Sequence, residues 1–338
     1  MPLAVASTPQ RTSRRPLTVA VASLLGATLF WAGNYIVGAG AVESIEPLSL
    51  VLLRWLGAVV PLLVIAQMAE RPQWKQVLAA WPWLVALSVF GLLGYNLLLY
   101  TALEHTDAFN ASLINAFNPA LITLAAAAFL RERLTRRAVG GVLVALAGVL
   151  LVLSNGDLGK LLQAGFGTGE LFMIGAIAAW SAYTITGRLA PPLPPITATA
   201  IQASITVVVL TPFSLAAGGP ALPTTQGAIA SLAFIALFPS VLSYLLWNRA
   251  LTVIPAGNAG VFLNLITVFT ALFTILSGHP YTFAQIAGGV IVIAGILLTS
   301  ARGPRGGAKP FFCRRRRAGN LEPWMKPLQK QPGPPPPD

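Results

Sequence analysis

Charged side chains are scarce in this sequence. Of its 338 residues, 9% are Asp, Glu, Lys or Arg, whereas 55% are hydrophobic, and the mean hydropathy is +0.73. Soluble domains carry roughly 25% charged residues, with which they cover an apolar core. The charges here are too few for that, and the sequence therefore predicts that lipid surrounds the protein.

Cysteine and histidine are nearly absent as well. Cys313 is the single cysteine, so no disulfide can form within the chain, and two histidines do not make a Cys/His metal cluster. The sequence also lacks a G-x-x-x-x-G-K-[ST] phosphate loop and a nucleophile with a neighbouring base. We therefore expect no metal, no cofactor, no ATP as a partner and no enzymatic activity.

The net charge of +12 does not indicate a nucleic-acid partner. Much of the positive charge lies beyond residue 301, and the rest gathers at the ends of hydrophobic runs. Lys and Arg at such positions favour the cytoplasmic face of a membrane, where anionic lipid lies. The lipid bilayer is the expected partner, and the sequence carries no signal for an oligomeric state.

Ten hydrophobic runs approach the length of about 20 residues that a membrane-spanning helix needs. They are predicted at 17–40, 47–68, 77–101, 108–130, 137–153, 168–188, 196–217, 226–248, 256–277 and 282–300. If ten spans alternate, one face receives nearly all the basic loop residues, namely Arg71, Lys75, Arg131, Arg133, Arg136, Arg137, Arg188 and Arg249. The opposite face receives mostly acids. This segregation predicts a bacterial-type inner (plasma) membrane protein with both termini in the cytoplasm.

The two halves of the sequence resemble each other. Trp31 to Gly38 matches Trp180 to Gly187 at an offset of 149 (180 − 31), and Ala102-Leu103 matches Ala250-Leu251 at 148. A third match, Gly141 to Gly148 with Gly288 to Gly295, follows at 147. The offset covers five spans, which is an odd number, so the halves enter the membrane in opposite directions.

The predicted fold is therefore an all-α polytopic membrane protein with ten transmembrane helices as a 5+5 inverted-topology repeat around a central cavity. The predicted parts are a cytoplasmic segment 1–16, repeats 17–153 and 168–300, and a basic, Pro-rich, disordered tail 301–338. Inverted repeats are typical of secondary transporters, because the halves can exchange conformations. A channel and a non-transporting scaffold or receptor are the alternatives.

Short motifs that close each half resemble those of a known family. Both sets resemble the endings of the two halves in EamA-type transporters of the drug/metabolite transporter superfamily. The first set is Leu130-Arg-Glu-Arg-Leu-Thr135 with Gly140-Gly141 and Ala147-Gly148-Val149. The second set is Gly278-His-Pro-Tyr-Thr282 with Gly288-Gly289 and Ala294-Gly295. Phe30-Trp31-Ala-Gly-Asn34 and Arg54 also fit. Two positions depart from the pattern, because His279 replaces a Glu and Arg131 replaces a Gly.

The resemblance covers about residues 17–300 and implies ten helices, no ATP hydrolysis, and export or exchange of small metabolites. Within the superfamily the sequence is most similar to aromatic-amino-acid exporters. The resemblance thus implies a small-molecule substrate, with amino acids including aromatic ones as the first expectation and other small organic amines or drugs as the alternative.

Polar and aromatic side chains in the middle of spans are candidates for substrate binding, because they are costly in lipid unless they face a cavity or another helix. Residues three or four apart share a helical face, which groups Trp31 with Asn34 and Tyr35, and Trp180 with Tyr183 and Thr184. The predicted substrate-binding residues are Trp31, Asn34, Tyr35, Tyr95, Asn96, Asn115, Trp180, Tyr183, Thr184, Tyr244, Trp247 and Asn264. Tyr100, near a span end, is expected to lie at the interface or to bond another helix.

Arg54 is a basic residue placed well inside a span. Such a residue needs a partner or water. It can pair with a substrate carboxylate, or it can serve structure by reaching outward to Glu43 or Glu46.

Overall fold

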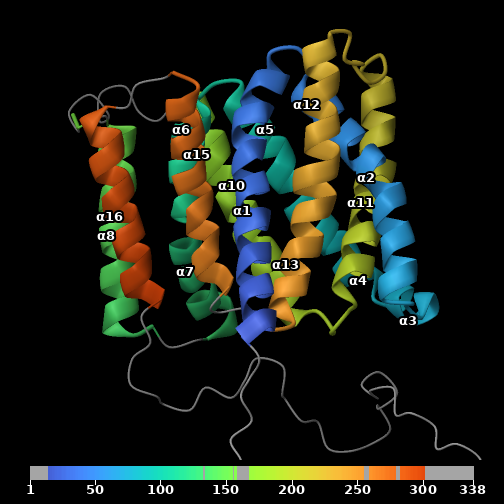
Figure 1. Cartoon of the computed structure of the whole chain (residues 1–338), viewed down its shortest axis with the longest axis horizontal. Helices are drawn as coiled ribbons and strands as arrows, with labels where there is room; N and C mark the ends of the chain where they lie inside the picture. Colours follow the sequence, from blue (N-terminus) through green and yellow to red (C-terminus); the bar gives the residue numbers. More distant parts are fainter. Residues whose placement is uncertain are drawn as a thin grey trace, which may run out of the picture. The chain divides into compact units, whose positions relative to one another are not determined.

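The structure, a computed structural model, describes residues 14–131, 134–154, 156–157, 167–254, 259–278 and 282–300. Every regular element within these residues is helical (Figure 1). The described residues from Arg14 to Ser300 form one compact unit. The predicted tail 301–338 and most of the predicted segment 1–16 lie outside the described residues.

The first half supplies five spans. They are α1 (Arg14–Val42); α2 (Pro47–Ala69); α4 (Trp81–Leu87) continued by the π-helix η1 (Ser88–Tyr95) and α5 (Asn96–Leu103); α6 (Ala108–Ala116) with α7 (Asn118–Leu130); and α8 (Arg136–Leu153). A short helix, α3 (Trp74–Ala79), precedes the third span. The carboxylate of Asp107 starts the fourth span, because it accepts from the backbone N–H groups of Phe109 and Asn110.

The second half supplies the other five spans. They are α10 (Thr168–Leu189); α11 (Pro195–Ala216); α12 (Gln226–Leu237) continued by the π-helix η2 (Phe238–Leu242) and α13 (Ser243–Leu251); the 3₁₀ turn η3 (Gly260–Asn264) with α15 (Leu265–Leu276); and α16 (Phe283–Ser300). The π-helices η1 and η2 both lie in the third span of their half. The two halves therefore share an irregularity as well as a helix order.

Length and composition suit a bilayer. Six helical runs in the described part of the chain are long and apolar enough to cross a membrane, namely Pro16–Val42, Pro47–Ala69, Trp81–Leu103, Ala108–Leu130, Pro195–Ala216 and Gln226–Leu251. Phe262–Leu276 and Phe283–Gly295 are shorter apolar helices, and α8 and α10 fill the two remaining positions. Large apolar side chains such as Val60, Phe129 and Val208 are exposed on the outside, where lipid replaces water.

The helices pair as an inverted repeat requires. The second spans of the two halves, α2 and α11, pack along each other, and so do the fifth spans, α8 and α16 (Figure 1). The first span of each half packs against the third span of the other, so α1 contacts α12 and α13 while α10 contacts η1 and α5. These exchanged contacts confirm the predicted 5+5 arrangement.

Glycines bring α8 and α16 into close contact. A Cβ atom on Gly148 would lie 2.7 Å from the Gly288 carbonyl oxygen and 2.7 Å from the Val292 nitrogen, so a side chain cannot fit there without a shift of backbone. Small residues of this kind let membrane helices pack closely without a hydrophobic driving force.

Polar contacts tie α2 to α11 at both ends. The Glu70 carboxylate accepts from the backbone N–H groups of Ile196 and Thr197 at 2.9 and 2.7 Å, which caps the start of α11. At the other end, Ser49 Oγ accepts from the Ala221 backbone N–H at 2.9 Å. The pair therefore forms a fixed support for the spans that line the centre.

Three spans predicted as continuous helices are interrupted. The run 108–130 breaks at Phe117, because Pro119 in the first turn of α7 has no N–H to continue the ladder of α6. The runs 77–101 and 226–248 change to π-helix over η1 and η2. Single π segments are frequent at functional sites, and both of these face the centre of the protein.

Candidate functional site

A central cavity lies between the two halves. The space in it that water-sized molecules can occupy is about 90 Å³. Helices from both halves line it. The lining residues are Trp31, Asn34, Tyr35, Arg54, Tyr95, Asn96, Leu99, Asn115, Ala116, Asn118, Pro119, Ile122, Trp180, Tyr244, Leu263, Asn264 and Ile266.

Two aromatic pairs line the cavity. Trp31 and Tyr244 pack edge to face with 5.7 Å between ring centroids, and Trp180 and Tyr95 pack at 5.0 Å with a tilt of 56°. Each pair joins the first span of one half to the third span of the other. The tryptophans correspond at an offset of 149 (180 − 31), and Tyr244 lies within one position of the counterpart of Tyr95, because the third spans match at 148 (250 − 102). The two pairs therefore lie at similar places in the inverted repeat.

Arg54 lies at one end of the cavity and is only 3% exposed. Its Nε and Nη2 donate to Ser240 Oγ at 3.0 and 2.8 Å, and its Nη1 donates to Asn96 Oδ1 at 2.7 Å and to the Tyr100 hydroxyl at 2.6 Å. The guanidinium carbon also lies 5.0 Å from the centroid of the Trp55 ring. These partners are neutral, so the positive charge remains available to an anion in the cavity.

Two acceptors of Arg54 lie in or next to the π segments, because Ser240 is in η2 and Asn96 directly follows η1. The Asn96 amide donates to the Leu92 carbonyl oxygen at 2.7 Å, and Ser240 Oγ donates to the Ile235 carbonyl oxygen at 2.7 Å. The Asn96 and Ser240 side chains thus each donate to a backbone carbonyl in or beside a π segment. At the same time, the side-chain oxygen of each accepts a hydrogen bond from Arg54. Through this network, Arg54 connects the third spans of the two halves. It does not reach Glu46, whose Oε1 accepts from Ser49 at 2.9 Å.

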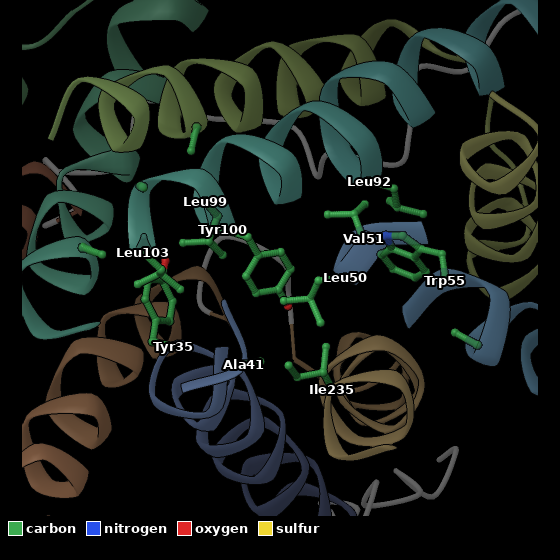
Figure 2. Packing of buried hydrophobic residues seen from close by; sticks show 14 of the residues in the cluster. Tyr35, Ala41, Leu50, Val51, Trp55, Leu92, Leu99, Tyr100, Leu103 and Ile235 are labelled. Atoms are coloured by element: carbon green, nitrogen blue, oxygen red, sulfur yellow. The ribbon is translucent and has the colours of Figure 1, made fainter. Parts of the chain in front are cut away.

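Tyr100 closes the cavity beside Arg54. Its hydroxyl accepts from Arg54 and donates to Asn34 Oδ1 at 2.8 Å, and its side chain is fully buried. In Figure 2 its ring lies beside Leu50, within the main cluster of buried residues. An interfacial position for Tyr100 is therefore wrong, and the alternative of bonding other helices is confirmed.

Amide and hydroxyl groups complete the cavity wall. The hydroxyls of Tyr35 and Tyr95 are hydrogen-bonded at 3.0 Å, and Tyr95 donates to Asn115 Oδ1 at 3.3 Å. Asn264 is 7% exposed, and its Nδ2 is buried without a hydrogen-bond partner among the described residues. A buried donor that lines a cavity and lacks a partner is a natural ligand for a substrate oxygen.

The structure brings most of the sequence-predicted site residues together. The cavity is lined by Trp31, Asn34, Tyr35, Arg54, Tyr95, Asn96, Asn115, Trp180, Tyr244 and Asn264. Three others do not line it. Thr184 Oγ1 bonds back to the Trp180 carbonyl at 2.9 Å, Tyr183 packs on Trp180 at 5.0 Å, and Trp247 packs on Trp31 at 5.5 Å. Tyr183 and Trp247 therefore lie behind the tryptophans and support them.

Sequence reasoning missed the apolar part of the lining. Leu99, Ala116, Ile122, Leu263 and Ile266 line the cavity, and no hydropathy signal separates them from the apolar residues that face lipid. Asn118 and Pro119 carried a usable signal, because an amide and a helix break occur there in mid-span. Asn118 Oδ1 accepts from Ser181 on α10 at 3.2 Å.

The charge of the lining is positive. Arg54 is the one charged side chain among the described residues that line the cavity. In the described residues no group of three or more His, Cys, Asp or Glu side chains is placed to hold a metal ion. The arrangement is therefore suited to bind a molecule with a negative group and an apolar or aromatic body.

Comparisons with known proteins agree with the fold. The sequence pattern of the EamA-like transporter family matches residues 18–154 and again residues 167–301. The "Uncharacterized transporter YyaM" of Bacillus subtilis (strain 168) is 29% identical over 282 residues, which are 82% of this chain and 92% of that protein.

Two further matches are more distant. A protein of Streptantibioticus cattleyicolor named "Probable terminal-alkyne amino-acid exporter" is 24% identical over 235 residues, which are 65% of this chain and 73% of that protein. One solved crystal structure of an unspecified protein is similar with a TM-score of 0.58 and 19% identity, and the match covers 85% of this chain and 98% of that one. The latter likeness concerns the fold alone.

Proposed function

The chain belongs to the EamA-like transporter family, and from this premise we propose that it exports or exchanges small amphipathic metabolites, amino acids including aromatic ones, by alternating access. The observation that carries the proposal is the pair of symmetric aromatic walls, Trp31 with Tyr244 and Trp180 with Tyr95. Aromatic faces favour a flat apolar or aromatic side chain between them. Two equivalent walls also present the same surface when the halves exchange conformations.

Arg54 is the proposed ligand for the substrate carboxylate. Its guanidinium is buried among neutral partners, and a planar guanidinium matches the geometry of a carboxylate. The unpartnered amide of Asn264 supplies a second donor. For an amino acid, the Asn oxygens and the aromatic faces offer the α-ammonium group hydrogen-bond acceptors and cation–π contacts.

The relative named as an amino-acid exporter supports the same substrate class. It matches 65% of this chain at 24% identity, so its name suggests amino acids without specifying which. Other small organic amines or drugs are the alternative substrates. A cation would meet the positive charge of Arg54 in a lining whose described residues include no carboxylate, which favours an anionic or zwitterionic substrate.

We also propose that both termini lie in the cytoplasm of a bacterial-type cell. Lys75, Arg188 and Arg249 follow spans that end on one face of the bundle, whereas Glu43, Glu104 and Asp107 lie on the other. Excess Lys and Arg mark the cytoplasmic side. With this orientation the end of the bundle near Gly38 faces outward and the end near Gly187 faces the cytoplasm.

Flux through liposomes tests the proposal. The purified full chain is reconstituted, and uptake of labelled amino acids, carboxylates lacking the amino group, and amines lacking the carboxylate is compared. We expect saturable uptake of the first group, weaker uptake of the second and least of the third. Uptake that rises linearly with concentration would favour a channel. A folded protein that moves none of the panel would favour a scaffold or receptor.

A further inference from the structure

Near one end of the cavity α1 makes a close contact with α5, and beyond this contact Leu103 and the end of α1 border a second pocket. Gly38 of α1 is buried, and a Cβ atom there would lie 2.8 Å from Tyr100 Cε1 and 3.3 Å from Leu103 Cδ1. Tyr100 is fully buried and Leu103 is 5% exposed. The absence of a side chain at Gly38 therefore allows α1 to press against α5 and close the space between them.

The inverted repeat places a matching set of residues at the opposite end. Gly187 corresponds to Gly38 (187 − 38 = 149), and Asn248 and Leu251 correspond to Tyr100 and Leu103 (248 − 100 = 148; 251 − 103 = 148). Here the contact is not made. Gly187 is exposed, and a Cβ atom there would meet only Leu87 Cδ2 within 4 Å, at 3.7 Å. Asn248 and Leu251 are each half-buried.

Helix packing shows the same asymmetry. In the first half, α1 packs against α5, whereas in the described part of the second half α10 makes no comparable contact with α13, the counterpart of α5. The cavity lining follows this difference. It extends to Ile122 on α7 and to Leu263 at the start of the ninth span, both beyond mid-span toward the Gly187 end.

From this broken symmetry we infer that Gly38 and Gly187 are the two alternating gate positions, and that in a second state α10 closes through Gly187 onto Asn248 and Leu251 while α1 separates from Tyr100 and Leu103. The inference rests on the proposed alternating access and assigns its two seals to named residues. Exchanging the conformations of the halves turns the contact seen at Gly38 into the contact absent at Gly187.

The gate at Gly38 is linked to the proposed substrate site. The Tyr100 hydroxyl is held by Arg54 of α2 and Asn34 of α1 at 2.6 and 2.8 Å, so separating α1 from Tyr100 must break the bond to Asn34. A carboxylate that binds Arg54 competes with the Tyr100 hydroxyl for the guanidinium. Anion binding therefore loosens this seal. Asn248 occupies the equivalent position at the other end, where no second arginine lines the described part of the cavity.

Reversible cross-linking tests the assignment. Cys313, the single cysteine, is replaced by Ser, and two cysteine pairs are built in the full chain in liposomes, Gly38→Cys with Leu103→Cys and Gly187→Cys with Leu251→Cys. In the present state a Cβ at position 38 would lie 3.3 Å from Leu103 Cδ1, with the Tyr100 ring displaced to make room, so the first pair is expected to form there. The second pair should form only after α10 closes onto α13. A static control, Gly140→Cys with Leu298→Cys, joins α8 to α16, where a Cβ on Gly140 would lie 3.9 Å from Leu298 Cδ2.

Mass spectrometry of a variant carrying both gate pairs gives the decisive result. We expect chains with either gate disulfide and fewer than one in ten with both, whereas the control disulfide should coexist with each. Both gate disulfides on the same chain, or no disulfide at Gly187 although the control forms, would overturn the inference. Unfolding temperatures of the reduced variants establish that they fold.

This readout needs no substrate, so it is independent of the substrate class. If the two gate disulfides are mutually exclusive but no amino acid is transported, the assignment of the gate residues is supported and the proposed substrate class is wrong. Where flux is present, each gate disulfide should lower it at least tenfold and reduction should restore it, while the control disulfide should leave it unchanged.

Discussion

Tyr95 packs against Trp180 with 5.0 Å between their ring centroids, and Trp31 packs against Tyr244 at 5.7 Å at a similar place in the other half. Because each contact joins the first span of one half to the third span of the other, a movement of either half changes both walls together. The cavity is thus lined by two of the contacts that join the halves.

Replacement of Trp31 or Trp180 by Ala should weaken substrate binding. Each change removes one wall, and aromatic contacts contribute about 0.5–1.5 kcal/mol beyond their buried area, so a loss of roughly tenfold in apparent affinity is expected. Initial rates of uptake against concentration measure it. Trp81→Ala is the control, because Trp81 is 63% exposed and remote from the lining. Equal kinetics in all three variants and the unmodified protein would remove the tryptophans from the site.

Arg54→Gln should abolish the preference for carboxylates. Hydrogen bonds to charged groups contribute about 1.5–3 kcal/mol, which predicts a roughly 10- to 100-fold loss for an amino acid and a smaller loss for its uncharged amide. Arg54→Lys should recover only part of the affinity, because an ammonium lacks the planar fork.

The matched control for Arg54 is Lys75→Gln, which removes a positive charge from the exposed surface of α3. It should transport normally. If Arg54→Gln lowers uptake of the amino acid and its amide by the same factor, Arg54 serves the structure and does not bind the carboxylate.

Tyr100→Phe should destabilise the present state. The change removes the hydroxyl that lies between Arg54 and Asn34 and leaves both with a missing partner in a buried place, at a cost of about 1–3 kcal/mol. A lower unfolding temperature in detergent is the expected result, together with faster labelling of a cysteine introduced at Leu103. Tyr183→Phe, behind the cavity wall, should have a smaller effect; the reverse order would contradict the role of Tyr100.

The packing of α8 on α16 gives a test that is independent of the site. Gly148→Ala forces a Cβ to 2.7 Å from backbone atoms of α16, and Gly140→Ala meets only one side-chain atom, at 3.9 Å. We expect Gly148→Ala to lower the free energy of unfolding by about 1–3 kcal/mol and Gly140→Ala to leave it nearly unchanged. Denaturant unfolding measures both, and equal stabilities would mean that the two helices separate easily.

The link between Glu70 and α11 should contribute to stability across the two halves. Glu70→Ala removes the acceptor of two backbone N–H groups and should cost about 1–2 kcal/mol, as other helix caps do. Glu70→Gln keeps one acceptor oxygen and should cost less. Thermal unfolding distinguishes them; a variant Glu70→Ala as stable as the unmodified protein would show that the cap is dispensable.

The sequence predicts those parts of the fold that the similarity between its two halves reveals. The matches of Trp31 with Trp180 and of Leu103 with Leu251 predict two inverted halves, and the halves pair in that way. The π segments escape prediction, since η1 contains no proline and is sustained by the amide of Asn96 bonding to the Leu92 carbonyl. That bond depends on tertiary contacts, including the one from Arg54.

Candidate site residues could be recognised from the sequence where polarity and mid-span position coincide, as they do for Trp31, Asn34 and Asn264. The same rule selected Thr184, whose hydroxyl bonds to its own helix, and did not select Ile122, because an apolar side chain facing a cavity resembles one facing lipid. Tyr100 was placed by its distance from the span end, while the structure buries it through its bonds to Arg54 and Asn34.

The most direct measurement is the initial rate of uptake of a labelled aromatic amino acid into liposomes containing the full chain, with and without unlabelled amino acid inside. Alternating access predicts a rate that saturates with concentration and rises when the internal side is loaded, and a roughly tenfold lower apparent affinity in Trp180→Ala. A rate that increases linearly and ignores the internal amino acid would contradict it.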